Sequence, residues 1–290
     1  MTTLDVDLGD VTLRCATYGP DDGPLALCLH GFPDTWHTFR YLAPHLAARG
    51  YHVVTPAMRG YAPSSVSASS NYQIAALASD ATMLHERLGG DERAVLIGHD
   101  WGAVAAYVAI TAEAPRWHRC VTMSVPPLFT VAASFMTFAQ LRASWYMFFF
   151  QGPLAELVVE LDDMAFVKDL MAQWSPGFDF SEDLVHVRAA LATAENRSAA
   201  LGYYRAMFDQ VLIDESHAAF DAARQQLPAV PSLYVHGEDD GCFLTSSLGN
   251  PLDFLAPGSR LAMVEHAGHF VHLEQPEIVH RVIDEFLAHS

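Results

Sequence analysis

Short apolar runs recur along the chain and predict the strands of a sheet. Most of the later runs are continuous rather than alternating, as expected for strands covered on both faces. Segments of helical length separate them, and this alternation predicts an α/β fold with a mostly parallel central sheet flanked by helices. The predicted strands span residues 11–19, 25–31, 51–57, 93–98, 119–125, 231–237 and 260–266. The predicted helices span residues 35–49, 73–89, 101–114 and 275–288.

The alternation stops at "VPPLF" (125–129) and resumes near "LPAVPSLYV" (227–235). The stretch between them is rich in Ala, Leu, Met and Phe, contains no convincing strand, and has proline clusters at both ends. We therefore predict a helical cap at residues 128–226, inserted into a core formed by residues 1–127 and 227–290. The alternative is an independent helical domain. It is less consistent with the sequence, because the same alternation of strands and helices continues after the insert.

The composition favours a well-filled core and argues against two classes of partner. Hydrophobic residues make up 51% of the 290 positions and charged residues 17%, which suits one large α/β domain with an insertion. Lys and Arg number 16 against 34 Asp and Glu, so the formal net charge is −18. Such a chain repels phosphate backbones and anionic lipid surfaces. We therefore expect neither nucleic-acid binding nor membrane insertion.

The four cysteines form no C-x-x-C pair and are too few for a disulfide scaffold, which predicts buried thiols in a reducing compartment. The N-terminal segment "MTTLDVDLGD" lacks the basic and apolar regions of a signal peptide. The densest apolar patch, at 144–152, is too short to cross a bilayer. These features predict a cytoplasmic protein. No metal cluster, nucleotide fingerprint or phosphate loop is visible, so no cofactor and no metal are expected.

The segment "GHDWGA" (98–103) follows the apolar run "AVLI" and has the frame G-x-D-x-G. A strand, this frame and a helix are the layout of a nucleophile elbow, in which the glycines allow close packing and the middle residue projects from a strained turn. An alternative interpretation is that Asp100 caps the helix that begins near Trp101, because aspartate is a favoured N-cap.

Together with "HGFPDTWHTF" (30–39) and "PAMRGYAPSS" (56–65), this segment resembles the epoxide hydrolases of the α/β-hydrolase superfamily, over nearly the whole chain. The resemblance implies the α/β-hydrolase fold and an Asp–His–Asp catalytic set. It also implies that the backbone N–H groups of Phe32, in the H-G-x-P loop, and of Trp101 form an oxyanion hole. One departure is Ala57, where relatives often carry Asp.

A carboxylate as nucleophile suits one class of substrate. An aspartate with a pKa of about 3.9 is ionised at neutral pH, so it can attack an sp3 carbon without a base. The product is an alkyl ester, which water can hydrolyse at the carbonyl carbon, whereas a serine would form an ether. Asp100 therefore predicts an alkylating substrate, which is an epoxide or an alkyl halide.

Hydrolysis of that ester requires water activated by a histidine with a carboxylate partner. Among the 15 histidines, His269 follows the last predicted strand and precedes the last predicted helix. This position agrees with the order nucleophile, acid, histidine. We interpret His266 and His272 as structural neighbours.

The acid is expected after the strand "SLYVHG", in the segment "HGEDDG" (236–241). This segment offers Glu238, Asp239 and Asp240. The G-x-x-D spacing of the family selects Asp240, and Asp239 remains the alternative.

The leaving group distinguishes an epoxide from a halide. An opening epoxide leaves an alkoxide, which benefits from a proton donor, and tyrosine with a pKa near 10 is protonated at neutral pH. The segments "WYMFFFQGPLAE" (145–156) and "GYYRAMF" (202–208) resemble the two family segments that carry such donors. The resemblance selects Tyr146 and Tyr204, and it does not select Tyr203.

These residues predict an epoxide hydrolase that converts a small apolar epoxide and water to a vicinal diol, a reaction suited to detoxification. A dehalogenase with the same catalytic set is an alternative, although haloalkane dehalogenases usually carry Asn where this chain has Phe32. A small-molecule receptor without catalytic activity is a further alternative. The resemblance is compatible with a homodimer, and the sequence leaves the oligomeric state open. The residues expected to contact the substrate are Phe32, Trp101, Tyr146 and Tyr204.

Overall fold

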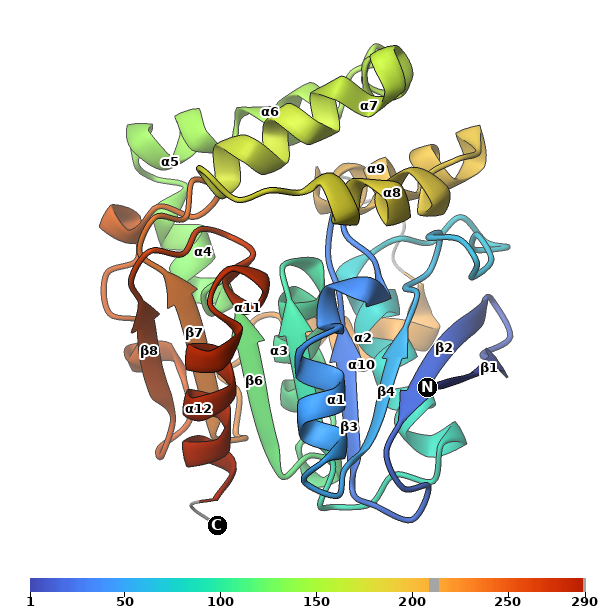
Figure 1. Ribbon diagram of the computed structural model, residues 1–290, viewed down its shortest axis with the longest axis vertical. Helices are drawn as coiled ribbons and strands as arrows, with labels where there is room; N and C mark the ends of the chain where they lie inside the picture. Colours follow the sequence, from blue (N-terminus) through green and yellow to red (C-terminus); the bar gives the residue numbers. More distant parts are fainter. Residues whose placement is uncertain (209–213, 289–290) are drawn as a thin grey trace.

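The computed structural model describes residues 1–208 and 214–288 (Figure 1). Eight strands form one sheet in the order β1-β2-β4-β3-β5-β6-β7-β8. The pairs β1–β2 and β2–β4 are antiparallel, and the other neighbouring pairs are parallel. The predicted α/β class with a mostly parallel sheet is therefore confirmed. The strands are β1 (Thr2–Asp7), β2 (Thr12–Tyr18), β3 (Leu25–Leu29), β4 (His52–Pro56), β5 (Val95–His99), β6 (Arg119–Met123), β7 (Ser232–Gly237) and β8 (Arg260–Val264).

Two elements differ from the sequence-based expectation. The hydrophobic pattern did not predict β1, because this edge strand buries only Val6 fully and has no continuous apolar run. The helix predicted at 35–49 is instead a 3₁₀ turn, η1 (Trp36–Phe39), followed by α1 (Leu42–Ala47). Pro44 explains this break, since it lacks the N–H that a continuous helix would direct to the residue four positions earlier.

Helices cover both faces of the sheet (Figure 1). Alternate β5 side chains enter different cores: Val95 and Ile97 join the one that includes residues of α1 and α12, and Leu96 joins the one that includes residues of α2 and α3. Because both faces of β5 are covered, its run of apolar residues is continuous. The helices of these layers are α2 (Ile74–Arg87), α3 (Trp101–Ala112), α10 (Ala218–Ala223), α11 (Val271–Glu274) and α12 (Pro276–Leu287).

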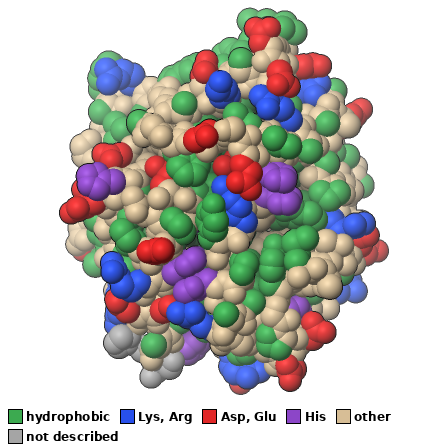
Figure 2. Space-filling model, in the orientation of Figure 1, with side chains coloured by type: hydrophobic (Ala, Val, Ile, Leu, Met, Phe, Trp, Pro, Cys, Tyr) green, Lys and Arg blue, Asp and Glu red, His purple; other side chains and the backbone are tan. Residues whose placement is uncertain are grey.

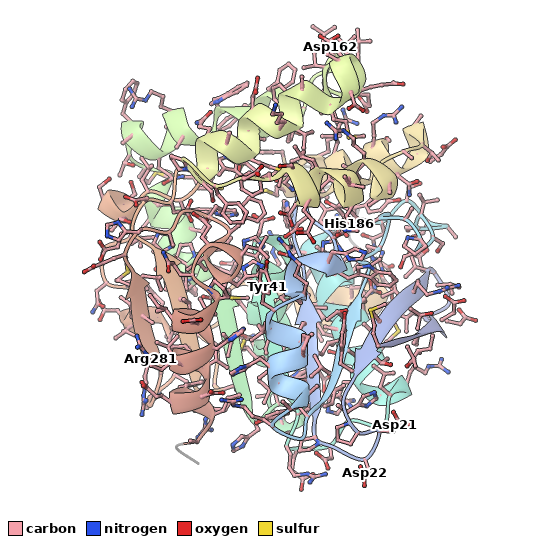
Figure 3. All side chains as sticks on the ribbon, in the orientation of Figure 1. Asp21, Asp22, Tyr41, Asp162, His186 and Arg281 are labelled. Carbon is pink, nitrogen blue, oxygen red and sulfur yellow. The ribbon has the colours of Figure 1, made fainter. Side chains whose placement is uncertain are left out.

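The other helices lie between β6 and β7 in the chain, and α5 to α9 form a layer above the sheet (Figure 1). His186 of α8 stacks on His37 of η1 with ring centroids 3.6 Å apart, which joins this layer to the core (Figure 3). In contrast, α10 packs against α2 and α3. The helices are α4 (Leu128–Ser134), α5 (Phe138–Ala143), α6 (Trp145–Phe149), α7 (Ala155–Trp174, without helical geometry at 161–164), α8 (Ser181–Ala190) and α9 (Ala194–Phe208). The division into core and cap remains a prediction. Residues 209–213 of the predicted cap and residues 289–290 of the predicted core lie outside the described part of the chain.

Short 3₁₀ turns complete the connections: η2 (Ala114–Arg116), η3 (Glu215–His217), η4 (Thr245–Ser247) and η5 (Pro251–Phe254). On the face drawn in Figure 2, acidic and basic side chains are interspersed with apolar ones. Within the described residues, no helix combines the length and the apolar character that a membrane span requires.

Candidate active site

Asp100 stands at the turn between β5 and α3. Its φ of 52° and ψ of −119° are rare for a residue other than glycine, and such strain is typical of functional sites. The flanking glycines permit the turn. A Cβ on Gly98 would lie 2.3 Å from the Gly102 carbonyl oxygen, and one on Gly102 would lie 2.0 Å from the Leu29 carbonyl oxygen. The turn thus holds Asp100 at the carboxyl end of a central parallel strand.

The Asp100 carboxylate does not cap the helix that follows it. Asp100 occupies the N-cap position of α3, but its side chain makes no capping hydrogen bond, so the capping interpretation is wrong. Instead, Oδ1 accepts a 2.7 Å hydrogen bond from the backbone N–H of Phe32. Trp101 is the first residue of α3, and the first four N–H groups of a helix have no intrahelical acceptor. The two amides expected in the oxyanion hole are therefore both close to Asp100. The Phe32 amide contacts the carboxylate in space, and the Trp101 amide belongs to the next residue in the chain.

His269 lies between two buried carboxylates. Its Nε2 atom is 3.4 Å from Oδ2 of Asp100, and its Nδ1 atom is 3.0 Å from Oδ2 of Asp240. Asp240 is held in place because its Oδ1 atom accepts hydrogen bonds from the N–H groups of Cys242, at 2.7 Å, and Phe243, at 3.0 Å. The structure therefore brings Asp100, His269 and Asp240 together from three separate loops.

The alternative acid and the neighbouring histidines do not share this position. Asp239 and Glu238 are exposed on the same loop. His266 is exposed, with a φ of 57°. His272 is buried, and its Nε2 atom lies 2.5 Å from the Thr38 hydroxyl rather than at Asp100.

The protonation of this group follows from burial and from its charges. Burial raises the pKa of Asp100, but the His269 imidazole and then the Phe32 N–H outweigh it and hold the pKa below its usual value. Burial lowers the pKa of His269, yet its neighbours raise it well above the usual value. Those neighbours are Cys242, Asp240 and Asp100. The Asp100 carboxyl is therefore ionised at neutral pH, and the His269 imidazole holds its proton more tightly than a free histidine does.

The two predicted tyrosine donors meet above the nucleophile. Tyr146 of α6 and Tyr204 of α9 are buried, with ring centroids 5.7 Å apart. The Tyr146 hydroxyl lies 3.3 Å from Sγ of Cys242, and the Tyr204 hydroxyl has no hydrogen-bond partner among the described residues. Burial raises the pKa of both phenols well above 10, so both are protonated. In contrast, the Tyr203 hydroxyl donates a 2.8 Å hydrogen bond to the carbonyl oxygen of Arg59.

A pocket with about 490 Å³ of empty space opens onto Asp100. Asp100, Trp101 and Tyr204 are the lining residues that carry a polar side-chain group, and the rest of the lining is apolar. Phe32 and Tyr146 lie behind that lining: the Phe32 ring contacts Tyr204 with centroids 5.2 Å apart. The other lining residues are Ile74, Val104, Val125, Leu128, Val131, Phe135, Met147, Met207 and Phe243.

No catalytic role was assigned from the sequence to four polar residues at or beside the site, one of which, His272, was interpreted as structural. Asp34, His99 and His272 are buried together, and their potential ligand atoms lie within 4.8 Å of one another. The Nε2 atom of His99 donates a 2.9 Å hydrogen bond to the His269 carbonyl oxygen, which links this cluster to the candidate catalytic histidine. Asp34 and His99 belong to the quoted "HGFPD" and "GHDWG" segments, which was a usable signal.

Cys242 is the fourth of these residues. All four cysteines are free and buried, as predicted, but the Cys242 side chain also reaches the candidate catalytic residues. Asp100, Cys242 and His269 form the second group of described residues whose donor atoms lie within 4.8 Å of one another. No pattern in the sequence indicates this contact, because it depends on the path of the loop after Asp240.

Residues 24–276 match the family described as "alpha/beta hydrolase fold", which is most of the chain. The chain belongs to the α/β hydrolase fold family. This α/β hydrolase is 28% identical over 289 residues to "AB hydrolase superfamily protein YfhM" of Bacillus subtilis, covering 98% of this chain and 97% of that protein. It is also 28% identical over 316 residues to "Epoxide hydrolase A" of Mycobacterium tuberculosis, covering 98% and 96%.

A solved structure supports the same fold for this α/β hydrolase. The crystal structure of Epoxide Hydrolase A from Mycobacterium thermoresistibile matches with a TM-score of 0.81 at 24% identity, and it covers 99% of this chain and 98% of that one. The predicted α/β-hydrolase fold and the resemblance to epoxide hydrolases of this superfamily are therefore confirmed.

Proposed function

We propose that this α/β hydrolase is an epoxide hydrolase that converts a small apolar epoxide to a vicinal diol through an alkyl ester on Asp100. The observation that carries the proposal is the setting of Asp100. One carboxylate oxygen is 2.7 Å from the Phe32 amide, the other is 3.4 Å from His269, and the group faces an apolar pocket. Relatives with the names of epoxide hydrolases support the substrate class.

In the first step, an Asp100 oxygen attacks an epoxide carbon and the carbon–oxygen bond of the ring breaks. The new alkoxide takes a proton from Tyr204 or Tyr146, and general acids in such positions contribute about 10²- to 10⁴-fold. The low pKa of Asp100 keeps the nucleophile ionised. The apolar lining suits an uncharged epoxide and excludes water from the first step.

Esterification then prepares the second step. The ester removes the negative charge of Asp100, which is one of the groups that hold a proton on His269, so the pKa of the imidazole falls. The imidazole releases its proton, which can restore the tyrosine, and then takes a proton from water. That water attacks the ester carbonyl while Asp240 holds the imidazole at Nδ1.

The tetrahedral intermediate of the second step carries an oxyanion. The backbone amides of Phe32 and Trp101 are the donors proposed to stabilise it. Removal of one donor of this kind costs about 2.7–4 kcal/mol of barrier in hydrolases. Collapse of the intermediate frees the diol as the departing oxygen takes a proton from His269. The Asp100 carboxyl then gives the proton that came with the water to His269, which restores the carboxylate and the imidazolium.

The Tyr204 hydroxyl favours an epoxide over an alkyl halide or a purely bound ligand. Tyr204 is one of the residues that line the pocket, and burial keeps its hydroxyl protonated. An alkoxide leaving group benefits strongly from such a proton donor, because an alkoxide is far more basic than a halide ion. A receptor would not require an imidazole between two carboxylates.

The test is to trap the ester. In His269→Gln, incubation with a terminal epoxide such as styrene oxide is expected to add the whole mass of the epoxide to the peptide that contains Asp100. Asp100→Ala is the matched control, and it is expected to give no adduct and no diol. A single turnover of the parent enzyme in oxygen-18 water is expected to label the Asp100 carboxylate and not the diol. An adduct on another residue, or label in the first diol released, contradicts the proposal.

A further inference from the structure

The Cys242 thiol lies against the nucleophile and the base, although the proposed reaction gives it no role. Its Sγ atom, a ring nitrogen of His269 and a carboxylate oxygen of Asp100 lie within 4.8 Å of one another. Cys242 and His269 are fully buried, and Asp100 is 5% exposed. The Nε2 atom of His269 faces Oδ2 of Asp100. The group thus combines a sulfur, a nitrogen and an oxygen donor around one small space.

This donor set is the one that zinc prefers. Thiolate sulfur, imidazole nitrogen and carboxylate oxygen bind Zn²⁺ in tetrahedral geometry, at about 2.3 Å for sulfur and about 2.0–2.2 Å for nitrogen and oxygen. Two ligands at the shorter distances, separated by a tetrahedral angle, lie about 3.4 Å apart. The Nε2 atom of His269 and Oδ2 of Asp100 are 3.4 Å apart. The cation can therefore bind between them without a large movement of either residue.

The surroundings of His269 also match a zinc site. Histidine ligands usually donate their second ring N–H to a carboxylate, which fixes the ring and its tautomer. Here Nδ1 of His269 lies 3.0 Å from Oδ2 of Asp240, and Asp240 is held by two backbone N–H groups. The pocket reaches Asp100 and offers a route for the ion.

We propose that Asp100, Cys242 and His269 form an inhibitory site for a thiophilic divalent cation such as Zn²⁺. Binding forms one metal bond to each side chain, leaves the fourth tetrahedral position for water, and releases the protons of the Cys242 thiol and the His269 imidazolium to solvent. No oxidation or reduction is involved. The ion occupies the nucleophile and the base together, so it excludes the epoxide. The inhibitory effect rests on the proposed function, whereas the binding does not.

The second buried cluster provides an internal comparison. Asp34, His99 and His272 also offer three donor atoms within 4.8 Å, but they include no sulfur, and none of them lines the pocket, whereas Asp100 of the first group does. A metal bound there would show no thiolate ligation. The two sites are therefore distinguishable by spectroscopy.

The experiment measures binding directly. Chelator-treated full-length protein is titrated with Co²⁺, whose bond to a thiolate gives an intense charge-transfer band in the near ultraviolet. We expect this band in the parent and in Cys15→Ala, the matched control for loss of a buried thiol, and not in Cys242→Ser. Loss of a group that only supports a ligand costs about 10- to 100-fold in metal affinity, so loss of the thiolate ligand is expected to weaken Zn²⁺ binding by about 100-fold or more.

Inhibition is measured in parallel. Zn²⁺ is expected to inhibit the parent competitively with the epoxide and reversibly on addition of chelator, and to inhibit Cys242→Ser far less relative to that variant's own zinc-free rate. A cobalt band that persists in Cys242→Ser, equal Zn²⁺ affinity in both proteins, or no band in the parent overturns the site. A band that depends on Cys242 in a protein without epoxide turnover supports the site and contradicts the proposed function. Turnover without the band contradicts the site alone.

Discussion

The Nδ1 atom of His269 lies 3.0 Å from Oδ2 of Asp240, although 29 positions separate the two residues in the chain. This contact gives His269 a fixed orientation, with Nε2 directed at Asp100. It is also the contact that distinguishes Asp240 from Asp239, since the Asp239 side chain is exposed.

Asp240→Asn is expected to slow hydrolysis of the ester far more than its formation. An amide cannot stabilise the imidazolium and favours the wrong tautomer, a change that costs about 10⁴-fold in the corresponding position of serine proteases. Rapid-quench kinetics with intact-mass detection is expected to reveal accumulation of the alkyl-enzyme. Asp239→Asn is the control and is expected to match the parent. Equal losses in the two variants would contradict the assignment of the acid.

A second prediction concerns Tyr146 and Tyr204, and its test changes the substrate as well as the protein. Tyr204→Phe and Tyr146→Phe are each expected to slow alkylation by an epoxide by about 10²-fold or more, because the alkoxide loses a proton donor. Alkylation of Asp100 by an alkyl bromide of similar shape is expected to change much less, since bromide needs no proton. Single-turnover rates with the two electrophiles measure this difference.

Tyr203→Phe is the control for the tyrosines. Its hydroxyl hydrogen bonds to the Arg59 carbonyl oxygen, so its loss is expected to cost about 1 kcal/mol of stability and to leave alkylation intact. A loss of alkylation in Tyr203→Phe as large as in Tyr204→Phe would show that the effect arises from cap packing.

A third prediction concerns the close approach of Gly31 to Asp100. A Cβ at this position would lie 2.3 Å from Oδ1 of Asp100, so Gly31→Ala is expected to displace the nucleophile from the Phe32 amide. A displacement of about 1 Å at a reacting group costs about 10²-fold in rate. Gly152→Ala is the control, because its nearest neighbour would lie at 3.4 Å. Adduct formation on Asp100 at the parental rate in Gly31→Ala would contradict this account.

The meeting of the three candidate catalytic residues could be predicted because each follows a strand of a parallel sheet. Asp100, Asp240 and His269 come directly after β5, β7 and β8, and the carboxyl ends of parallel strands lie at one edge of a sheet. The sequence therefore indicates that these residues meet. It contains no comparable rule for Cys242, whose position depends on the two hydrogen bonds by which Asp240 shapes the loop.

The edge strand and the pocket wall were harder to predict. β1 buries only Val6 fully, so its hydrophobic pattern resembles that of a loop. Phe32 and Tyr146 were both expected to contact substrate, and neither is among the lining residues. The Phe32 ring packs on Phe150 with centroids 5.5 Å apart. How helices of the insert lie on the core decides such contacts, and this arrangement is a tertiary property.

The last prediction concerns Asp34 and the pH dependence of the free energy of unfolding rather than a reaction rate. Burial raises the pKa of Asp34 to about 8, against about 3.9 in the unfolded chain. Between these values the native protein holds a proton that the unfolded chain has released, so stability falls as pH rises and the fall ends above the native pKa. The buried His99 and His272, whose pKa values are lowered, act in the opposite direction below about pH 6.5, where the unfolded chain protonates histidine.

From about pH 6.5 to 8 the parent is expected to lose about 1.5 kcal/mol more stability than Asp34→Asn. The contribution of His269, whose pKa is raised, is common to both proteins. Urea unfolding at the two pH values measures the change in the free energy of unfolding for each protein. A pH-independent cost of the substitution cancels in this comparison. Asp22→Asn is the control, since Asp22 is exposed on the loop between β2 and β3 (Figure 3) and is expected to follow the parent. If Asp34→Asn and the parent lose stability in parallel, Asp34 is ionised in the native state, and a partner for its charge must exist beside His99.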